Sequence, residues 1–300
     1  MSTRRHFLGG AAALCLTPLA GRAHPMQDAP AFSISLAQWS LHRTLRDGKL
    51  SALDFPAKAK ALGFGAVEYV NSFFVDRVGD KVWLEDLRGR CRDLDIQNLL
   101  IMCDGLGALG DPDAAARTQA IERHLPWLDA AKTLGCHSIR VNAQSDGTRD
   151  EQTQRAADGL RRLAEQGDQR GLNVIVENHG GLSSDGSWLA GVMAAVDHPR
   201  IGTLPDFGNF HLGEGKWYDR YQGVKELMPY AKAVSAKSHA FDDQGNETGT
   251  DYGRMLGIVL DSGYRGWIGV EYEGADLDEE RGILLTKALL ERLRAARTAK

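Results

Sequence analysis

A unit of about 30 residues recurs along this chain and constrains the fold more than any other feature of the sequence. Each copy has an amphipathic helix rich in Ala and Leu, a glycine turn, a short β-branched strand and a polar residue at the strand's end. Glycine is typical of the left-handed cap that ends a helix, and β-branched residues favour strands. In the four plain copies we expect helices within 57–62, 125–134, 160–170 and 255–262, followed by strands at 66–70, 138–142, 174–178 and 267–271.

Four weaker strand patterns fill the gaps, at 32–38, 97–102, 201–204 and 233–238. Eight strands that alternate with helices predict a parallel sheet, which closes most simply into a single (β/α)8 TIM barrel. The alternative is an open doubly wound sheet, but the sequence has neither Gly-x-Gly-x-x-Gly after the first strand nor a phosphate-binding Gly-Lys-Ser/Thr loop. No linker divides the repeats, so we expect one barrel domain over residues 24–300.

The first 23 residues resemble a twin-arginine export signal. Two arginines in the run RRHFL at 4–8 precede an apolar stretch at 7–20, and small residues around Ala23 suit a signal peptidase. The apolar stretch is too short for an ordinary membrane span. We therefore expect cleavage after Ala23, a periplasmic or secreted location and no stable membrane insertion afterwards; the alternative is a disordered or membrane-anchoring arm.

Composition narrows the class of protein. The chain is 43 % hydrophobic and 25 % charged, as in soluble globular proteins, and this excludes a disordered, collagen-like or many-spanning membrane protein. The 36 Lys and Arg stand against 40 Asp and Glu, with no long basic run. We therefore expect no nucleic-acid partner.

Polar residues follow the last four strands at a regular spacing. Glu177, Asp206, His239 and Glu271 are separated by 29, 33 and 32 residues, each about one βα unit. In a barrel the carboxyl ends of the strands meet in one mouth, so these side chains should face a common point. At such short distances three carboxylates would repel one another unless a cation lay between them.

The four residues therefore predict a site for one divalent metal. Oxygen ligands with one imidazole suit manganese, magnesium, cobalt or iron, and zinc is a further candidate. Such a ligand set leaves coordination positions open for a substrate. The alternative for each residue is an ordinary side chain of the mouth whose hydrogen bonds are satisfied by its neighbours.

Several motifs resemble the xylose isomerase-like TIM-barrel superfamily, the sugar phosphate isomerase/epimerase and AP endonuclease 2-like group. They are SLAQWS at 35–40, GAVEY at 65–69, VENH at 176–179, DFGN at 206–209, KSH at 237–239 and VEYEG at 270–274. The resemblance spans residues 30–295. It implies an isomerase or epimerase acting on a sugar or keto-sugar, in which the four ligands hold one metal and Glu177 and Glu271 also act as catalytic acid and base.

The expected chemistry is removal of a proton next to a carbonyl, with a metal-bound enediolate. Candidate sugar-binding residues with inward-facing strand positions are His179, Asn142, Arg140, Lys237 and Trp39. The resemblance adds Asn209, which stands where ketose 3-epimerases have a substrate-binding histidine. Glu273 is expected to support a metal ligand. The alternative for each of these residues is a purely structural role in the barrel.

Other functions remain open at this point. A lyase or hydratase on 3-keto-glycosides or inososes would use the same barrel and metal, because elimination begins with the same proton abstraction. A nuclease-like phosphodiesterase would need a basic groove, and a non-catalytic sugar-binding barrel would not need the four ligands. The expected partner is a small sugar, and a homodimer is an open alternative to a monomer.

Overall fold

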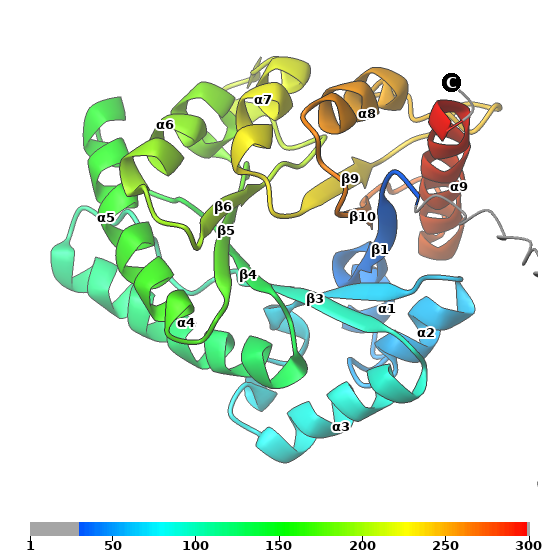
Figure 1. Cartoon of the computed structure of the whole chain (residues 1–300), viewed down its shortest axis with the longest axis horizontal. Helices are drawn as coiled ribbons and strands as arrows, with labels where there is room; N and C mark the ends of the chain where they lie inside the picture. The colour runs from blue at the N-terminus through cyan, green and yellow to red at the C-terminus, as the bar shows by residue number, and fades with distance from the viewer. Residues whose placement is uncertain (1–29, 299–300) are drawn as a thin grey trace, which may run out of the picture.

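Eight parallel strands form a ring that helices enclose in the computed structural model of the chain (Figure 1). The structure describes residues 30–298, so the expected signal at residues 1–23 lies outside it. Among the described helices, none is long and apolar enough to cross a membrane.

The eight strands expected from the sequence are all present, each within one residue of its expected bounds. They are β1 Ser33–Ala37, β2 Ala66–Val70, β3 Gln97–Met102, β4 Ser138–Val141, β5 Asn173–Glu177, β6 Ile201–Leu204, β9 Val234–Ser238 and β10 Trp267–Tyr272. Their order in the sheet is β6-β5-β4-β3-β2-β1-β10-β9, with every neighbouring pair parallel. The prediction of a TIM barrel is confirmed.

Backbone contacts between β6 and β9 close the ring. Parallel bridges pair Thr203 with Ala231 and Asp206 with Ser235. The amide of Ser235 donates to the carbonyl of Pro205 at 3.0 Å, and the carbonyl of Ser235 accepts from the amide of Phe207 at 3.1 Å. The closure therefore fixes the backbone on both sides of Asp206, one of the expected metal ligands.

The outer helices begin and end where local chemistry dictates. They are α1 His42–Arg46, α2 Phe55–Ala61, α3 Lys81–Asp93, α4 Ala114–Leu134, α5 Arg149–Asp168, α6 Gly186–Val196, α7 Arg220–Leu227, α8 Tyr252–Asp261 and α9 Glu279–Thr298. Aspartate or threonine side chains cap α3 to α8 by accepting from backbone amides of the first turn. The glycines of the four plain repeats have φ between 74° and 87°, as expected for left-handed turns.

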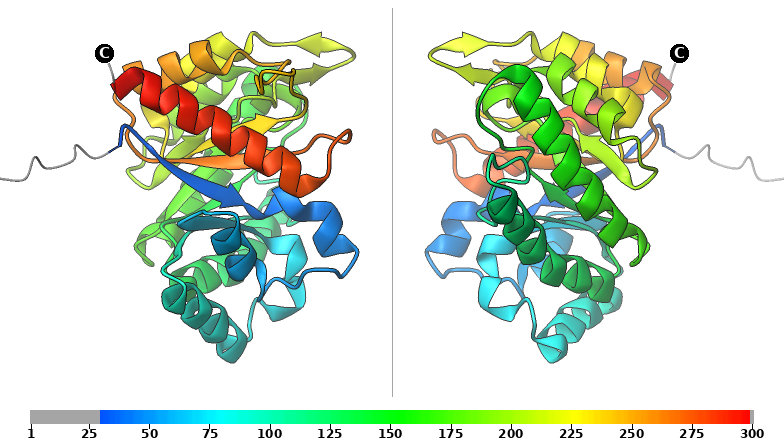
Figure 2. Two further views of the ribbon diagram at one scale, coloured as in Figure 1. Left: turned by 90° about the vertical axis from the view of Figure 1, so that its right-hand side faces the viewer. Right: turned by 90° about the vertical axis from the view of Figure 1, so that its left-hand side faces the viewer.

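A two-stranded hairpin interrupts the repeat between β6 and α7. Its antiparallel strands are β7 His211–Gly213 and β8 Lys216–Trp217, which are too short to give a strand pattern in the sequence. The hairpin projects on the side towards which the β1 arrow points, so it stands at the carboxyl end of the barrel (Figure 2). Trp217 on this hairpin is 60 % exposed.

Two glycines inside helices should respond to alanine in opposite directions. A Cβ atom on Gly159 of α5 would lie 1.8 Å from the carbonyl oxygen of Leu109, whereas a Cβ atom on Gly191 of α6 would meet nothing within 4 Å. We expect Gly159→Ala to lower the free energy of unfolding by about 1–3 kcal/mol or more through overpacking. Gly191→Ala should raise it by about 0.4–1 kcal/mol. Urea unfolding of both variants checks this, and a stable Gly159→Ala variant would contradict the close packing of α5.

Candidate functional site at the barrel mouth

Three of the four expected metal ligands come together at the carboxyl end of the barrel. One carboxylate oxygen each from Glu177, Asp206 and Glu271 lies within 4.8 Å of the others, and all three residues are buried. Glu177 is the last residue of β5, Glu271 lies in β10, and Asp206 follows β6 by two residues. We call these three residues the acidic triad.

Each member of the triad is oriented by hydrogen bonds. Oε1 of Glu177 accepts from the Asn209 side-chain amide at 2.9 Å, and Oε2 of Glu271 accepts from the Ser235 hydroxyl at 2.7 Å. Oδ1 of Asp206 accepts from the backbone amides of Gly208 and Asn209, both at 2.8 Å. These partners orient the carboxylates and leave one oxygen of each without a hydrogen bond from them.

Two buried cations pair with the triad. Nε of Arg140 on β4 lies 2.7 Å from Oε2 of Glu177, and its Nη1 donates to Asp104 at 2.6 Å. Nζ of Lys237 on β9 lies 3.1 Å from Oε1 of Glu271. Both cations were expected to contact substrate, and in this structure both form ion pairs with the proposed acid and base groups.

The fourth expected ligand, His239, does not join the triad. Its side chain is 52 % exposed, and its Nε2 atom lies 3.9 Å from Oε2 of Glu273. The strand β9 ends at Ser238, so His239 stands one residue beyond it. The side chain of Lys237, only 5 % exposed, faces the triad in its place.

The remaining expected site residues line the same mouth. Nε1 of Trp39 donates to Glu273 at 2.7 Å, and Nδ2 of Asn142 donates to Asp104 at 2.8 Å. Glu273 also pairs with Lys237 at 3.1 Å. His179 borders the cavity above the triad, and burial lowers the pKa of its imidazole.

Two carboxylates, one inside the barrel and one at its mouth, were missed by the sequence analysis. Glu68 lies inside the barrel on β2, where Oε1 accepts from the Ser35 hydroxyl at 2.5 Å and Oε2 has no hydrogen-bond partner. Asp104 follows β3 by two residues, as Asp206 follows β6. A charged residue within an otherwise apolar strand and a repeated offset after a strand end were the signals that could have found them.

The buried carboxylates outnumber the buried cations. In the protein without a bound ion, burial raises the pKa of Glu177 to about 8, that of Glu68 to about 7 and that of Asp206 to about 6. Arg140 and Lys237 oppose these shifts but do not cancel them. The site therefore favours the uptake of positive charge, either as protons or as a cation.

The triad has the donors that a divalent ion requires. Carboxylate oxygens are preferred by magnesium and manganese, and Oδ2 of Asp206 is buried without a hydrogen-bond partner. The three carboxylates therefore fit a divalent ion, although they lack the expected histidine ligand.

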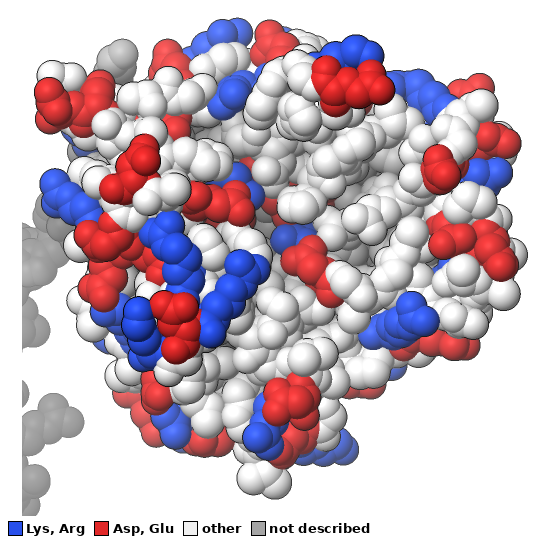
Figure 3. Space-filling view, turned by 180° about the vertical axis from the view of Figure 1, so that it is seen from behind, with Lys and Arg blue, Asp and Glu red and all other residues white. Residues whose placement is uncertain are grey.

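A cavity of about 410 Å³ opens above the triad and is lined by Trp39, Asp104, Asn142 and His179 as well as by the two buried cations. Its volume lies in the range of about 300–1,000 Å³ typical of small-molecule sites. Figure 3 looks onto this side of the molecule, where the surface is hollowed near its centre and charged side chains of both signs surround the hollow.

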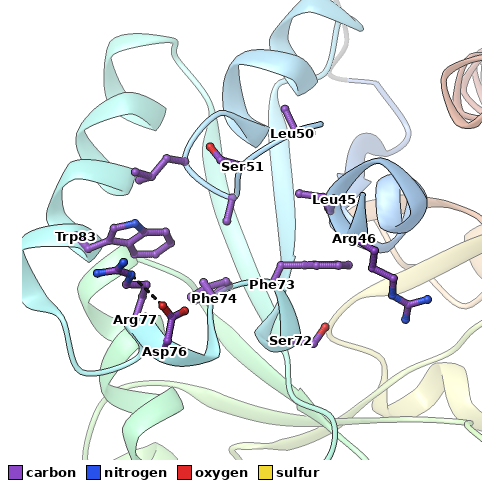
Figure 4. Close-up of a pocket in the computed structure, with 12 residues that line it drawn as sticks. Leu45, Arg46, Leu50, Ser51, Ser72, Phe73, Phe74, Asp76, Arg77 and Trp83 are labelled. Atoms are coloured by element: carbon purple, nitrogen blue, oxygen red, sulfur yellow. Dashed lines mark ion pairs between the residues drawn. The ribbon is translucent and has the colours of Figure 1, made fainter. Parts of the chain in front are cut away.

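A second cavity of about 460 Å³ adjoins the first and shares Arg46 and Ser72 with it. Three aromatic side chains, Phe73, Phe74 and Trp83, line it together with polar groups (Figure 4). The ring of Phe73 lies 6.2 Å from that of Trp39, so aromatic surface continues from the mouth into the second cavity.

The buried carboxyl of Glu68 should make stability depend on pH. Because its pKa is about 7 in the folded protein and near 4.5 when unfolded, the folded chain keeps a proton that the unfolded chain releases between these values. Glu68 therefore contributes stability below pH 4.5 that is lost as the pH rises to about 7.

In the metal-free wild type, the contribution of Glu68 to the free energy of unfolding should fall between pH 4.5 and pH 8. Glu68→Gln removes this contribution, so the variant should gain up to about 3 kcal/mol at pH 8 relative to pH 4.5 when compared with the wild type. Urea unfolding at several pH values measures this difference, and Glu214→Gln on the exposed hairpin is the control. An identical pH profile in wild type and Glu68→Gln would show that Glu68 is not protonated in the folded protein.

Solved structures with the same fold include several sugar-handling proteins. The 3-keto-D-glucoside 4-epimerase YcjR from E. coli is 15 % identical, with a TM-score of 0.66 over 87 % of this chain and 99 % of that protein. An L-ribulose 3-epimerase is also 15 % identical, with a TM-score of 0.69 over 89 % of this chain and 97 % of that protein. A xylose isomerase-like TIM barrel protein from Mycobacterium smegmatis, in complex with magnesium, is 15 % identical, with a TM-score of 0.68 over 89 % and 99 %.

At such low identities these structures confirm the fold alone. The sequence has no significant match among curated proteins. The family model described as xylose isomerase-like TIM barrel, however, matches residues 56–296, which include the whole acidic triad. The chain therefore belongs to the xylose isomerase-like TIM barrel family.

Proposed function

We propose that this protein is a sugar isomerase or epimerase that moves a proton at a carbon next to a carbonyl group. The observation that carries the proposal is the pair of buried glutamates, Glu177 on β5 and Glu271 on β10, whose carboxylate oxygens lie within 4.8 Å of each other although their strands are not neighbours. Glu271 also lines the cavity at the mouth. Similar folds occur in a 3-keto-D-glucoside 4-epimerase and an L-ribulose 3-epimerase, which supports this class of reaction.

The two glutamates exchange the proton, and their neighbours bind and orient. One carboxylate takes a proton from carbon and the other returns it, which requires both to be held near the same carbon. Asn209 and Ser235 hold the two glutamates by the hydrogen bonds described above. Arg140 and Lys237 carry positive charge beside the cavity, where it stabilises negative charge that develops on a substrate oxygen.

We propose that a divalent metal is the cofactor, held by Glu177, Asp206 and Glu271. When bound there, the ion supplies a Lewis acid for the substrate oxygens. Carboxylates accept manganese, magnesium, cobalt, iron and zinc, and each of these ions fits the proposal.

Exchange of substrate hydrogen with solvent tests the proton-transfer step. In deuterated water, NMR should show deuterium entering ketoses or 3-keto-glycosides. Glu177→Gln and Glu271→Gln should each slow this exchange by about 10²–10⁴-fold, the usual contribution of an acid or base group. Glu214→Gln, whose side chain is 85 % exposed, is the matched control and should exchange at the wild-type rate.

Removal of divalent ions with a chelator should lower the exchange rate, and manganese should restore it. Exchange that survives both glutamine substitutions would overturn the assignment of Glu177 and Glu271. Product analysis separates the related reactions, since an epimerase returns an isomer whereas a lyase releases a leaving group.

We further propose that the substrate extends beyond one sugar ring, with its second group in the aromatic cavity shown in Figure 4. Aromatic faces beside polar groups suit the apolar faces and hydroxyls of a glycoside. Keto-glycosides with a large aglycone should therefore react with a kcat/KM about tenfold higher than methyl keto-glycosides, if the added contacts contribute about 1.4 kcal/mol.

Blocking the passage tests where the second group binds. Ser72, shared by the two cavities, is exposed, and Ser72→Trp should remove the preference for the larger aglycone. Leu212→Trp is the matched control, because Leu212 lines a different cavity, which shares His179 with the cavity at the mouth. Loss of the preference in Leu212→Trp instead would place the second group in that other cavity.

A further inference from the structure

Lys237 occupies the position at which this site lacks its fourth protein ligand. In the ladder between β9 and β10, Lys237 stands directly opposite Glu271. Its ammonium nitrogen lies 3.1 Å from Oε1 of Glu271 and 3.1 Å from Oε2 of Glu273. The ammonium therefore bridges a carboxylate of the triad and a carboxylate outside it.

His239 is held away from this position by its own contacts. Its backbone amide donates to Oε1 of Glu247 at 3.3 Å, which ties it to the loop after β9. Lys237 lies within β9, directly opposite Glu271. His239 lies one residue beyond the strand, and its side chain is open to solvent.

We propose that Lys237 is an internal cation that neutralises Glu271 in the metal-free protein and keeps the affinity of the triad for divalent ions low. The inference rests on the metal site of the proposed function. A protonated lysine has three donors and no acceptor, so it cannot coordinate a metal. A metal bound to Glu271 would lie within a few ångströms of this ammonium and would be repelled by it.

Glu273 gives the ammonium a second partner when an ion binds. It is two residues beyond Glu271 and lies at the rim of the cavity, with its side chain 32 % exposed. It also accepts from Nε1 of Trp39 at 2.7 Å, which fixes its carboxylate. The flexible side chain of Lys237 can thus leave Glu271 while it keeps its contact with Glu273. A metal ion therefore has to compete with the Lys237 ammonium for Glu271.

Manganese affinity tests the proposal independently of any reaction. Metal-free protein and its variants are titrated with Mn²⁺ in a calorimeter. Lys237→Met should bind Mn²⁺ about tenfold more tightly than wild type, or better, because one positive charge beside the ligands is removed. Lys237→His should gain at least as much, since an imidazole at this position can add a nitrogen ligand.

Arg46→Met is the matched control for a general loss of positive charge at the mouth. The Arg46 guanidinium is exposed, lines the same cavity and lies 4.8 Å from the centre of the Trp39 ring. Its removal should change the affinity by less than about twofold, because solvent and salt screen exposed charges. Melting curves of the metal-free variants show which are folded, and Lys237→Gln replaces Lys237→Met if the latter does not fold.

The possible outcomes separate this inference from the proposed function. The role of Lys237 would be overturned if Lys237→Met and Lys237→His both bound Mn²⁺ no more tightly than the wild type. It would also be overturned if Arg46→Met gained as much Mn²⁺ affinity as Lys237→Met. If the variants bind Mn²⁺ and the wild type does not, the role of Lys237 holds and the metal dependence of the proposed function fails. If neither the wild type nor the variants bind Mn²⁺, the role of Lys237 and the metal dependence both fail. If the affinities follow the expected order but the wild type exchanges no substrate hydrogen with solvent, only the proposed reaction is overturned.

Discussion

The balance of buried charge inside the barrel is the constraint on which the rest of the site depends. Glu177, Asp206 and Glu271 bring three carboxylates within 4.8 Å, and such a group is costly to remove from water unless positive charge lies beside it. Arg140 and Lys237 supply part of that charge from neighbouring positions in the barrel. The raised pKa values of Glu177 and Asp206 show that the compensation is incomplete, and this incompleteness makes the site receptive to a cation.

The repeated βα unit turns this electrostatic arrangement into a precise geometry. Each unit ends a parallel strand at the same edge, so polar residues far apart in the sequence meet in one mouth. Asp206 illustrates the precision, because the hydrogen bonds that close the barrel between β6 and β9 involve Pro205 and Phe207 on either side of it. Barrel closure and the position of one carboxylate of the triad therefore depend on the same short segment.

The sequence was sufficient to predict the barrel and the three residues of the triad, but not which residue at the end of β9 lies beside them. Periodicity and turn glycines predict strands well because they depend on local chemistry and burial. The spacing also predicted that Glu177, Asp206 and Glu271 would converge. It could not distinguish Lys237 from His239, since both have inward-facing strand positions and the choice depends on where β9 ends.

Glu68 and the β7–β8 hairpin were missed for different reasons. Glu68 belongs to a strand whose other residues are apolar or aromatic, and its burial depends on room left by Gly269, where a Cβ atom would lie 2.6 Å from its carboxylate. Such a contact joins two strands that are far apart in the sequence, so the charged residue in β2 is a signal by itself but the space beside Gly269 cannot be inferred from either strand. The hairpin strands are of two and three residues, below the length at which alternation can be recognised.

An internal cation and a bound metal are two solutions to the same electrostatic problem, and this chain has the groups for both. Buried ion pairs with Arg140 and Lys237 give Glu177 and Glu271 positive partners within the protein itself. The same pairs reduce what an incoming ion gains, because it replaces positive charge that is already present. Stability without metal and tight metal binding are therefore opposed at Glu271, and Lys237 sets the balance between them.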